Sequence, residues 1–177
     1  MSEILSAELW PYFLTRKIAT GAVRQVFGLI RSGQGIFARL KRQQMHAVIL
    51  VPVMRMGQYP KYQIEPLLLH EMSMGDPGGW EHRYDEIARC KALQLWSGRN
   101  DGGFSNQPHL LFAGDTPYWG GVKRDGIVVA CSGVQPYFDR MCAGMIADMA
   151  IACAHDEYED WRKGQSAELD FVNEYGM

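Results

Sequence analysis

The sequence predicts an α+β protein in which helices pack on an antiparallel sheet. Three observations indicate this class. Apolar residues recur at steps of three and four over residues 16–30 and again over 81–96, which is the period of an amphipathic helix. Segments 46–54 and 62–72 are apolar and β-branched, with turn-forming residues between them, as in a hairpin. A second two-stranded unit and another helix follow, so strands and helices alternate along the chain.

Length, composition and charge indicate the number of domains, the partners and the cellular location. A chain of 177 residues that is 47% apolar suits one compact domain, and the formal charge of −2 supplies no electrostatic reason to bind nucleic acid or an anionic membrane. No run of about 18 apolar residues is present, and the first residues lack the pattern of a secretion signal. The four cysteines form no CxxC pair. We therefore expect a cytoplasmic protein with reduced thiols.

The N-terminal part, residues 1–45, is predicted to be mainly helical. Residues 5–14 form an apolar stripe interrupted by Pro11, which we interpret as a short helix or docking arm. Thr15 is placed to cap the helix over 16–30. A glycine-containing break at 32–35 precedes a second, basic helical piece that ends near Gln44. We interpret Arg39, Lys41 and Arg42 in this piece as a solvated face.

The hairpin over 46–72 is predicted to lie in the sheet. Pro52 indicates an edge or a bulge, because proline cannot donate to the strand ladder. Residues 57–61 form the turn, and 74–80 form a glycine-rich loop before the helix over 81–96. The expected apolar face of that helix is made by the following residues: Ile87, Cys90, Ala92, Leu93 and Trp96.

The stretch from Pro108 to Ala154 organises the rest of the chain. An apolar strand from Leu110 is predicted to end in a glycine-aromatic loop, and a turn over 123–126 leads to a second strand over 127–131. Ser132 and Gly133 interrupt that strand, and a helix begins near Pro136. Residues 156–177 read as a polar, acidic tail, with Trp161 as a docking anchor.

Several residues match the motifs of a known family. An A-x-x-K-A helix motif is matched by Ala88, Lys91 and Ala92, and a G-G-x-P loop is approximated by Gly114 and Pro117. The family's glycine-rich strand and the helix after it are matched by Gly126, Ala130, Ser132, Gly133 and Asp139. Over about residues 46–155 the chain resembles the GlcG/HbpS-like family, of the haem-degrading-domain or corrinoid-adenosyltransferase C-terminal type. It resembles a divergent member of that family, because Cys131, Tyr118 and Trp119 depart from the usual residues.

The resemblance implies more than the residue pattern shows. It implies a profilin-like sheet of about five strands in one domain spanning 1–177, with residues 46–155 as its core. It also implies a homo-oligomer and a planar ligand such as haem or a corrinoid. The three tryptophans Trp10, Trp119 and Trp161 independently favour association, since tryptophan is enriched at interfaces.

No catalytic signature or metal-ligand motif is present, so the candidate site rests on two weaker features. The first is the glycine-aromatic loop, in which Tyr118 and Trp119 can stack on a flat ligand. The second is the start of the 81–96 helix, where Arg83 can hold a carboxylate while His82 or Glu86 moves a proton. The predicted ligand-binding residues are Trp80, Arg83, Tyr84, Gly114, Tyr118, Trp119, Gly120 and Gly121, and the predicted catalytic residues are His82 and Glu86. The alternative for both features is structural, namely aromatic residues that cap the core and a solvated helix face.

Other polar residues are assigned structural roles. His46 and His155 are interpreted as structural histidines, Cys131 as a small buried hydrophobe and Asp139 as an acid that complements the helix dipole.

Two functions follow from these features. One is a binding module that holds a planar anionic ligand such as haem or a corrinoid. The other is a cofactor-free enzyme, a lyase that acts on a small polar aromatic acid. A reaction like that of hydroxylaminobenzoate lyase, which releases ammonia, is the concrete example.

Overall fold

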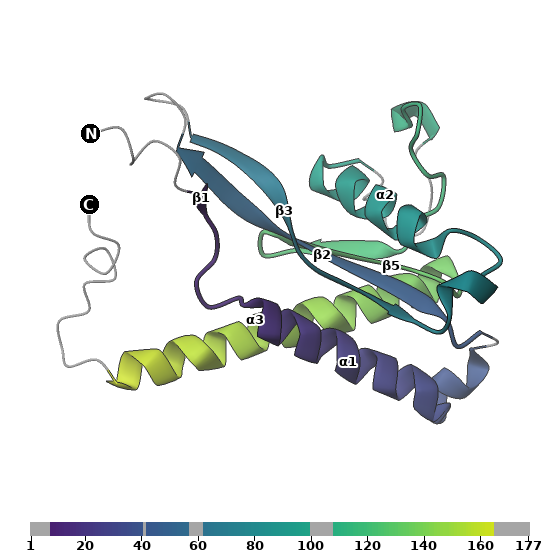
Figure 1. Cartoon of the computed structure of the whole chain (residues 1–177), viewed down its shortest axis with the longest axis horizontal. Helices are drawn as coiled ribbons and strands as arrows, with labels where there is room; N and C mark the ends of the chain where they lie inside the picture. The colour runs from purple at the N-terminus through teal and green to yellow at the C-terminus, as the bar shows by residue number, and fades with distance from the viewer. Residues whose placement is uncertain (1–7, 41, 57–61, 100–107, 165–177) are drawn as a thin grey trace.

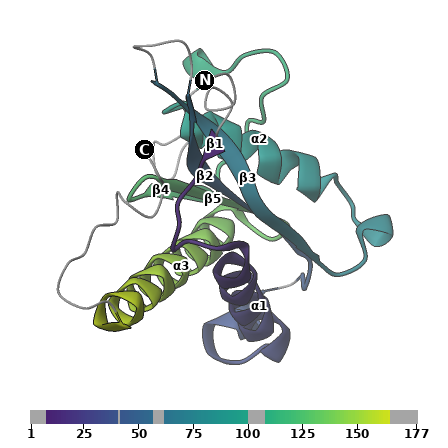
Figure 2. The ribbon, with the colours of Figure 1, turned by 60° about the vertical axis from the view of Figure 1, so that its left-hand side comes forward.

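The computed structural model describes residues 8–40, 42–56, 62–99 and 108–164. It confirms the α+β class: a five-stranded antiparallel sheet carries helices on both faces (Figure 1). The helices α1 (Arg16–Ser32) and α3 (Pro136–Gly164) lie side by side on one face. The third, α2 (Tyr84–Trp96), covers part of the other face, as the turned view also shows (Figure 2).

The central strand is β2 (Met45–Met56). It pairs along its length with β3 (Tyr62–Met74), while β5 (Ile127–Ser132) and the two-residue β1 (Glu8–Leu9) share its other side. The last strand, β4 (Gly121–Arg124), pairs with β5 through a turn at Asp125 and Gly126. Both predicted hairpins are therefore present, and residues 57–61 of the first turn lie outside the described residues.

Pro52 lies where its missing N–H costs no hydrogen bond. It faces Pro66 of β3, and two prolines can oppose each other only at a position that makes no hydrogen bonds between the strands. On its other side, the pairing of β2 with β5 ends at Leu50 and that with β1 begins at Met54. The predicted irregularity is a register shift three residues earlier, between Ile49 and Leu50.

Successive β2 side chains divide between two cores. Ala47, Ile49 and Val51 face α1 and α3 in the larger core, whereas Val48 and Leu50 face α2 in the smaller one. The helix α1 matches its prediction. It begins after Thr15, whose hydroxyl accepts a hydrogen bond from the Ile18 N–H at 3.3 Å.

Segment 5–14 is not a helix within its described part, because residues 8 and 9 form β1. The docking interpretation agrees with the structure: the Phe13 ring packs edge-on against Trp161 and Tyr158 of α3. The second basic piece is a short 3₁₀ helix, η2 (Gly35–Arg39).

The buried face of α2 differs from the predicted one. Leu93 is exposed, whereas the buried residues of the helix are Tyr84, Ala88, Lys91, Ala92, Gln94 and Leu95. The prediction was right for Ala92 and wrong for Leu93, because the polar residues Lys91 and Gln94 were not expected on the buried face. Gln94 instead bonds both to the N–H and to the C=O of Thr116 at 3.1 Å, which satisfies its buried amide.

Asp139 lies in the first turn of α3, as predicted, and it also forms a buried ion pair with Lys91 that was not predicted. The Lys91 Nζ lies 3.1 Å from Asp139 Oδ2 and donates to the carbonyl of Cys131 at 2.8 Å. Burial raises the pKa of Asp139, and the Lys91 charge opposes that rise. Cys131 is fully buried, as expected.

Two predicted segments have a different structure. The strand expected from Leu110 is a 3₁₀ turn, η4 (Pro108–Leu110), followed by a loop that leads into β4. The acidic tail expected from residue 156 is helical as far as Gly164, since α3 continues to that residue. None of the helices in the described ranges is both long and apolar enough to cross a membrane.

Candidate ligand-binding pocket

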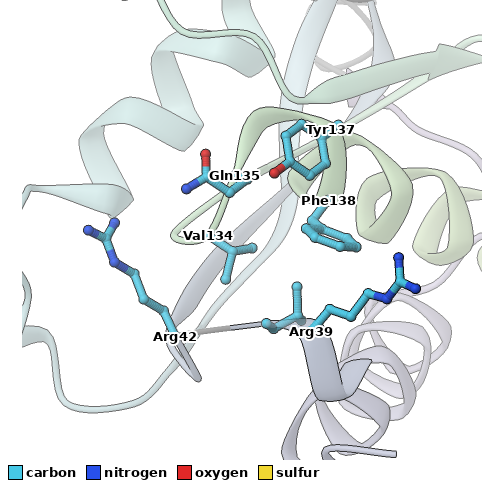
Figure 3. Close-up of a pocket in the computed structure, with 7 residues that line it drawn as sticks. Arg39, Arg42, Val134, Gln135, Tyr137 and Phe138 are labelled. Carbon is cyan, nitrogen blue, oxygen red and sulfur yellow. The ribbon is translucent and has the colours of Figure 1, made fainter. Parts of the chain in front are cut away.

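A pocket of about 250 Å³ opens where η2 meets the start of α3 (Figure 3). One wall comes from the segment that leads into β2 and the other from the segment that follows β5. The lining residues are Arg39, Leu40, Arg42, Val134, Gln135, Tyr137 and Phe138. In the close-up Arg42 lies on one side of Val134, while Arg39 lies on the other side, next to the Phe138 ring and below Tyr137. The pocket therefore combines cationic groups with flat apolar surface.

The two walls are held together at Gly133. This glycine has φ +150°, and a Cβ there would lie 2.3 Å from the carbonyl oxygen of Gln44. Only glycine allows so close an approach. Asp139 fixes the same segment from the α3 side, because its Oδ1 accepts the Val134 N–H at 3.2 Å. The residues matched to the family motif thus shape the pocket without lining it.

The arginines of the pocket differ in their partners. The Arg42 guanidinium lies 2.5 Å from Glu81 Oε2 and donates to the Tyr84 hydroxyl at 3.1 Å. Gln44 donates to the same hydroxyl at 3.4 Å. Arg39 is exposed and pairs with no described carboxylate. Arg42 is therefore held in place, while the Arg39 charge is available to a ligand.

The predicted residues at the start of α2 have mixed surroundings. Tyr84 is buried and holds Arg42, and Trp80 packs against it with ring centroids 5.5 Å apart. The Trp80 Nε1 is buried without a described hydrogen-bond partner. His82, Arg83 and Glu86 are exposed and do not line the pocket.

A charge network joins the start of α2 to the sheet. Arg83 lies 3.2 Å from Asp85 and 2.9 Å from Glu86, and its hydrogen bond lowers the pKa of Asp85 to about 2. Asp85 also pairs with Arg89, one helical turn further along α2, at 3.3 Å. These side chains pair with one another at the surface. Arg83 and Glu86 therefore agree with the alternative interpretation, a solvated helix face, and not with a ligand site.

His46 is joined to this network and is more enclosed than the sequence suggested. Its side chain is 5% exposed, with Nδ1 2.9 Å from the Ser73 hydroxyl and Nε2 3.4 Å from Glu71. Arg89 binds both oxygens of Glu71, at 2.7 and 2.8 Å, and this lowers the pKa of Glu71. Burial lowers the pKa of His46 and so favours the neutral imidazole.

The glycine-aromatic loop lies against the middle of α2. Cys90 lies 3.7 Å from the carbonyl of Gly114, and Gln94 binds the backbone of Thr116. Tyr118 is half exposed, and Trp119 is partly buried. Neither lines the pocket beside η2.

The last two glycines of the loop are packing positions. A Cβ on Gly120, where φ is +132°, would lie 2.7 Å from the Asp139 Cβ and 3.0 Å from the Lys91 Nζ. A Cβ on Gly121 would lie 2.5 Å from Leu95. A side chain at either position would first disturb the contacts of α2 with the sheet and α3.

Sequence reasoning missed the aromatic wall of the pocket, while the predicted solvation of Arg39 agrees with its exposure. Arg39 and Arg42 were noticed as basic but assigned to a solvated face. Two aromatic residues directly after Pro136, at the predicted start of a helix, were the available signal for Tyr137 and Phe138. Within the described residues, no group of three or more His, Cys, Asp or Glu side chains is arranged to hold a metal ion.

Comparison with known proteins adds no assignment: no family model matches this chain, and neither the curated proteins nor the solved structures contain a match.

Proposed function

We propose that this protein binds a small planar organic anion, with an aromatic monocarboxylate as the best fit. The observation that carries the proposal is a pocket lined by Arg39 and Arg42 from one segment and by Tyr137 and Phe138 from another, with Arg39 next to the Phe138 ring. A guanidinium can hold a carboxylate through two parallel hydrogen bonds. An aromatic ring offers offset stacking to a flat ligand, so the two walls suit the two parts of a benzoate-like molecule.

Pocket size selects among the expected ligands. Pockets that enclose drug-sized ligands usually measure about 300–1,000 Å³. A volume of about 250 Å³ suits a single-ring acid, whereas haem or a corrinoid would enter only at its edge. The GlcG/HbpS-like assignment remains a proposal, supported by the motif residues at Lys91, Gly133 and Asp139, which organise the pocket walls.

Binding is better supported than the lyase reaction. Of the seven lining residues, only Arg39, Arg42 and Tyr137 carry ionisable groups. The predicted proton-transfer residues His82 and Glu86 are not among them. A lyase would need a proton donor that reaches the leaving nitrogen, and these walls offer the Tyr137 hydroxyl alone.

The test is titration with benzoate, with neutral benzamide as the matched ligand, followed by calorimetry. We expect benzoate to bind and benzamide to bind at least tenfold more weakly. Arg39→Ala should weaken benzoate binding by about 1.5–3 kcal/mol, tenfold or more, because a charge-assisted hydrogen bond is lost. Arg162→Ala is the control variant, since Arg162 is exposed on α3 and does not line the pocket.

The competing site at the start of α2 gives the opposite pattern. If Arg83 and His82 hold the anion, Arg83→Ala and His82→Ala should weaken binding while Arg39→Ala does not. That result would reject the pocket. A haemin titration that produces a Soret band and is abolished by Arg39→Ala would keep the pocket and change the ligand to haem.

A further inference from the structure

Charge is strongly segregated along this chain. Residues 1–64 contain nine lysines and arginines against two acids, and residues 65–177 contain nine against 18, which gives formal charges of +7 and −9. No aspartate or glutamate occurs between Glu8 and Glu65. The net charge of −2 is therefore the sum of a basic part, residues 1–64, and an acidic part, residues 65–177, which can bind different partners.

The basic part presents a straight row of side chains on α1. Lys17, Arg24 and Arg31 are exposed and seven residues apart, a spacing that returns to nearly the same side of a helix. Arg16, the residue before Lys17, donates to the Leu69 carbonyl at 3.1 Å, so the start of α1 lies beside β3. None of the three pairs with a carboxylate of the described residues.

Most of the described acids in this part already pair with a base of the same chain, while the formal charge of the part remains −9. Described acids that already pair with a lysine or arginine are Glu71, Glu81, Asp85, Glu86, Asp115, Asp139, Asp148, Glu159 and Asp160. Asp156 and Glu157 on α3 are exposed, adjacent and paired with no described base. They lie about two turns before the C-terminal end of α3 at Gly164. In Figure 1 this end of α3 projects past the start of α1.

We propose that the Lys17–Arg24–Arg31 row is an interface for a second copy of this chain, whose Asp156 and Glu157 lie against it. Under twofold symmetry each copy supplies one basic row and one acidic helix end, so a single arrangement forms the contact twice. A nucleic acid or an anionic membrane would meet the basic row but would be repelled by the −9 part of the molecule. A second copy of the chain offers an acidic surface to the basic row and a basic surface to Asp156 and Glu157.

The experiment measures mass by light scattering at low and high salt and uses two charge-reversal variants. The basic-row variant is Arg24→Glu with Arg31→Glu, and the acidic variant is Asp156→Lys with Glu157→Lys. All four residues are exposed, and circular dichroism checks that each variant folds. In each variant alone, both contacts of a twofold pair become repulsive. In an equal mixture of the two variants, both contacts of the mixed pair become attractive.

We expect the unaltered protein to exceed its monomer mass of 20.0 kDa at about 0.05 M salt and to dissociate near 1 M, where screening is nearly complete. Each variant alone should be monomeric, and mixing should restore a species of twice the monomer mass. A monomeric unaltered protein at low salt would overturn the proposal. Retained assembly in either variant would do the same, as would a mixture that stays monomeric. A monomer that binds heparin or anionic vesicles through the basic row would assign the row to a polyanion instead.

Discussion

The buried ion pair between Lys91 and Asp139 gives the sharpest test of how the two helices are joined. Its side chains are 2% and 4% exposed, and it links α2 to the first turn of α3 beneath the close approach at Gly120. Replacing Lys91 by Met keeps most of the side-chain volume and removes the cation. Asp139 is then left buried without its counter-charge.

The expected cost follows from that uncompensated charge. Breaking a buried ion pair by removing one partner typically lowers the free energy of unfolding by about 3–5 kcal/mol. Small proteins have about 5–15 kcal/mol in total, so Lys91→Met should remove a large part of the stability. Adding Asp139→Asn should recover much of the loss, because the amide oxygen can still accept the Val134 N–H and no charge is buried.

The effect has a defined pH dependence. Burial already raises the pKa of Asp139, and removing Lys91 lets it rise further. A carboxyl with a raised native pKa destabilises the fold as pH rises above the unfolded value of about 3.9. The loss in Lys91→Met should therefore be small near pH 4 and full near pH 7. Urea unfolding at both pH values measures it. A loss below about 1 kcal/mol at pH 7, or a double variant no more stable than Lys91→Met, would refute the reasoning.

Two further predictions concern stability. Gly121→Ala should lower the free energy of unfolding by about 1–3 kcal/mol, because its methyl group would lie 2.5 Å from Leu95. Gly28→Ala adds a methyl group in open space on α1 and should raise the free energy of unfolding by about 0.5–1 kcal/mol. The same urea titration measures both changes. The lowered pKa of His46 means that the native state holds the imidazole neutral, so the stability that it contributes above pH 6.5 is lost as pH falls. His46→Gln should flatten the decrease in unfolding free energy between about pH 7 and pH 5, with part remaining because burial also lowers the pKa of His70. An unchanged slope would mean that His46 titrates normally in the folded protein.

Local sequence signals were sufficient for the elements and their order. The period of apolar residues in α1, the Thr15 cap, the apolar run of β2 and the turn at Asp125 and Gly126 are properties of short segments. The class follows from them, because antiparallel hairpins that alternate with amphipathic helices must bury their apolar faces against each other. The motif residues Gly133 and Asp139 were also found from the sequence, although the ion pair of Asp139 with Lys91 was not.

Tertiary structure decided which faces are buried and which side chains meet. The face of α2 was mispredicted because Lys91 and Gln94 find buried partners, Asp139 and the Thr116 backbone, that lie 48 and 22 residues away in sequence. The pocket was missed for the same reason, since Arg39 and Tyr137 come from distant segments that Gly133 brings together. A polar side chain reads as solvated when only its neighbours in sequence are considered. Its burial depends on a hydrogen-bond partner that the fold supplies, and only the folded chain shows that partner.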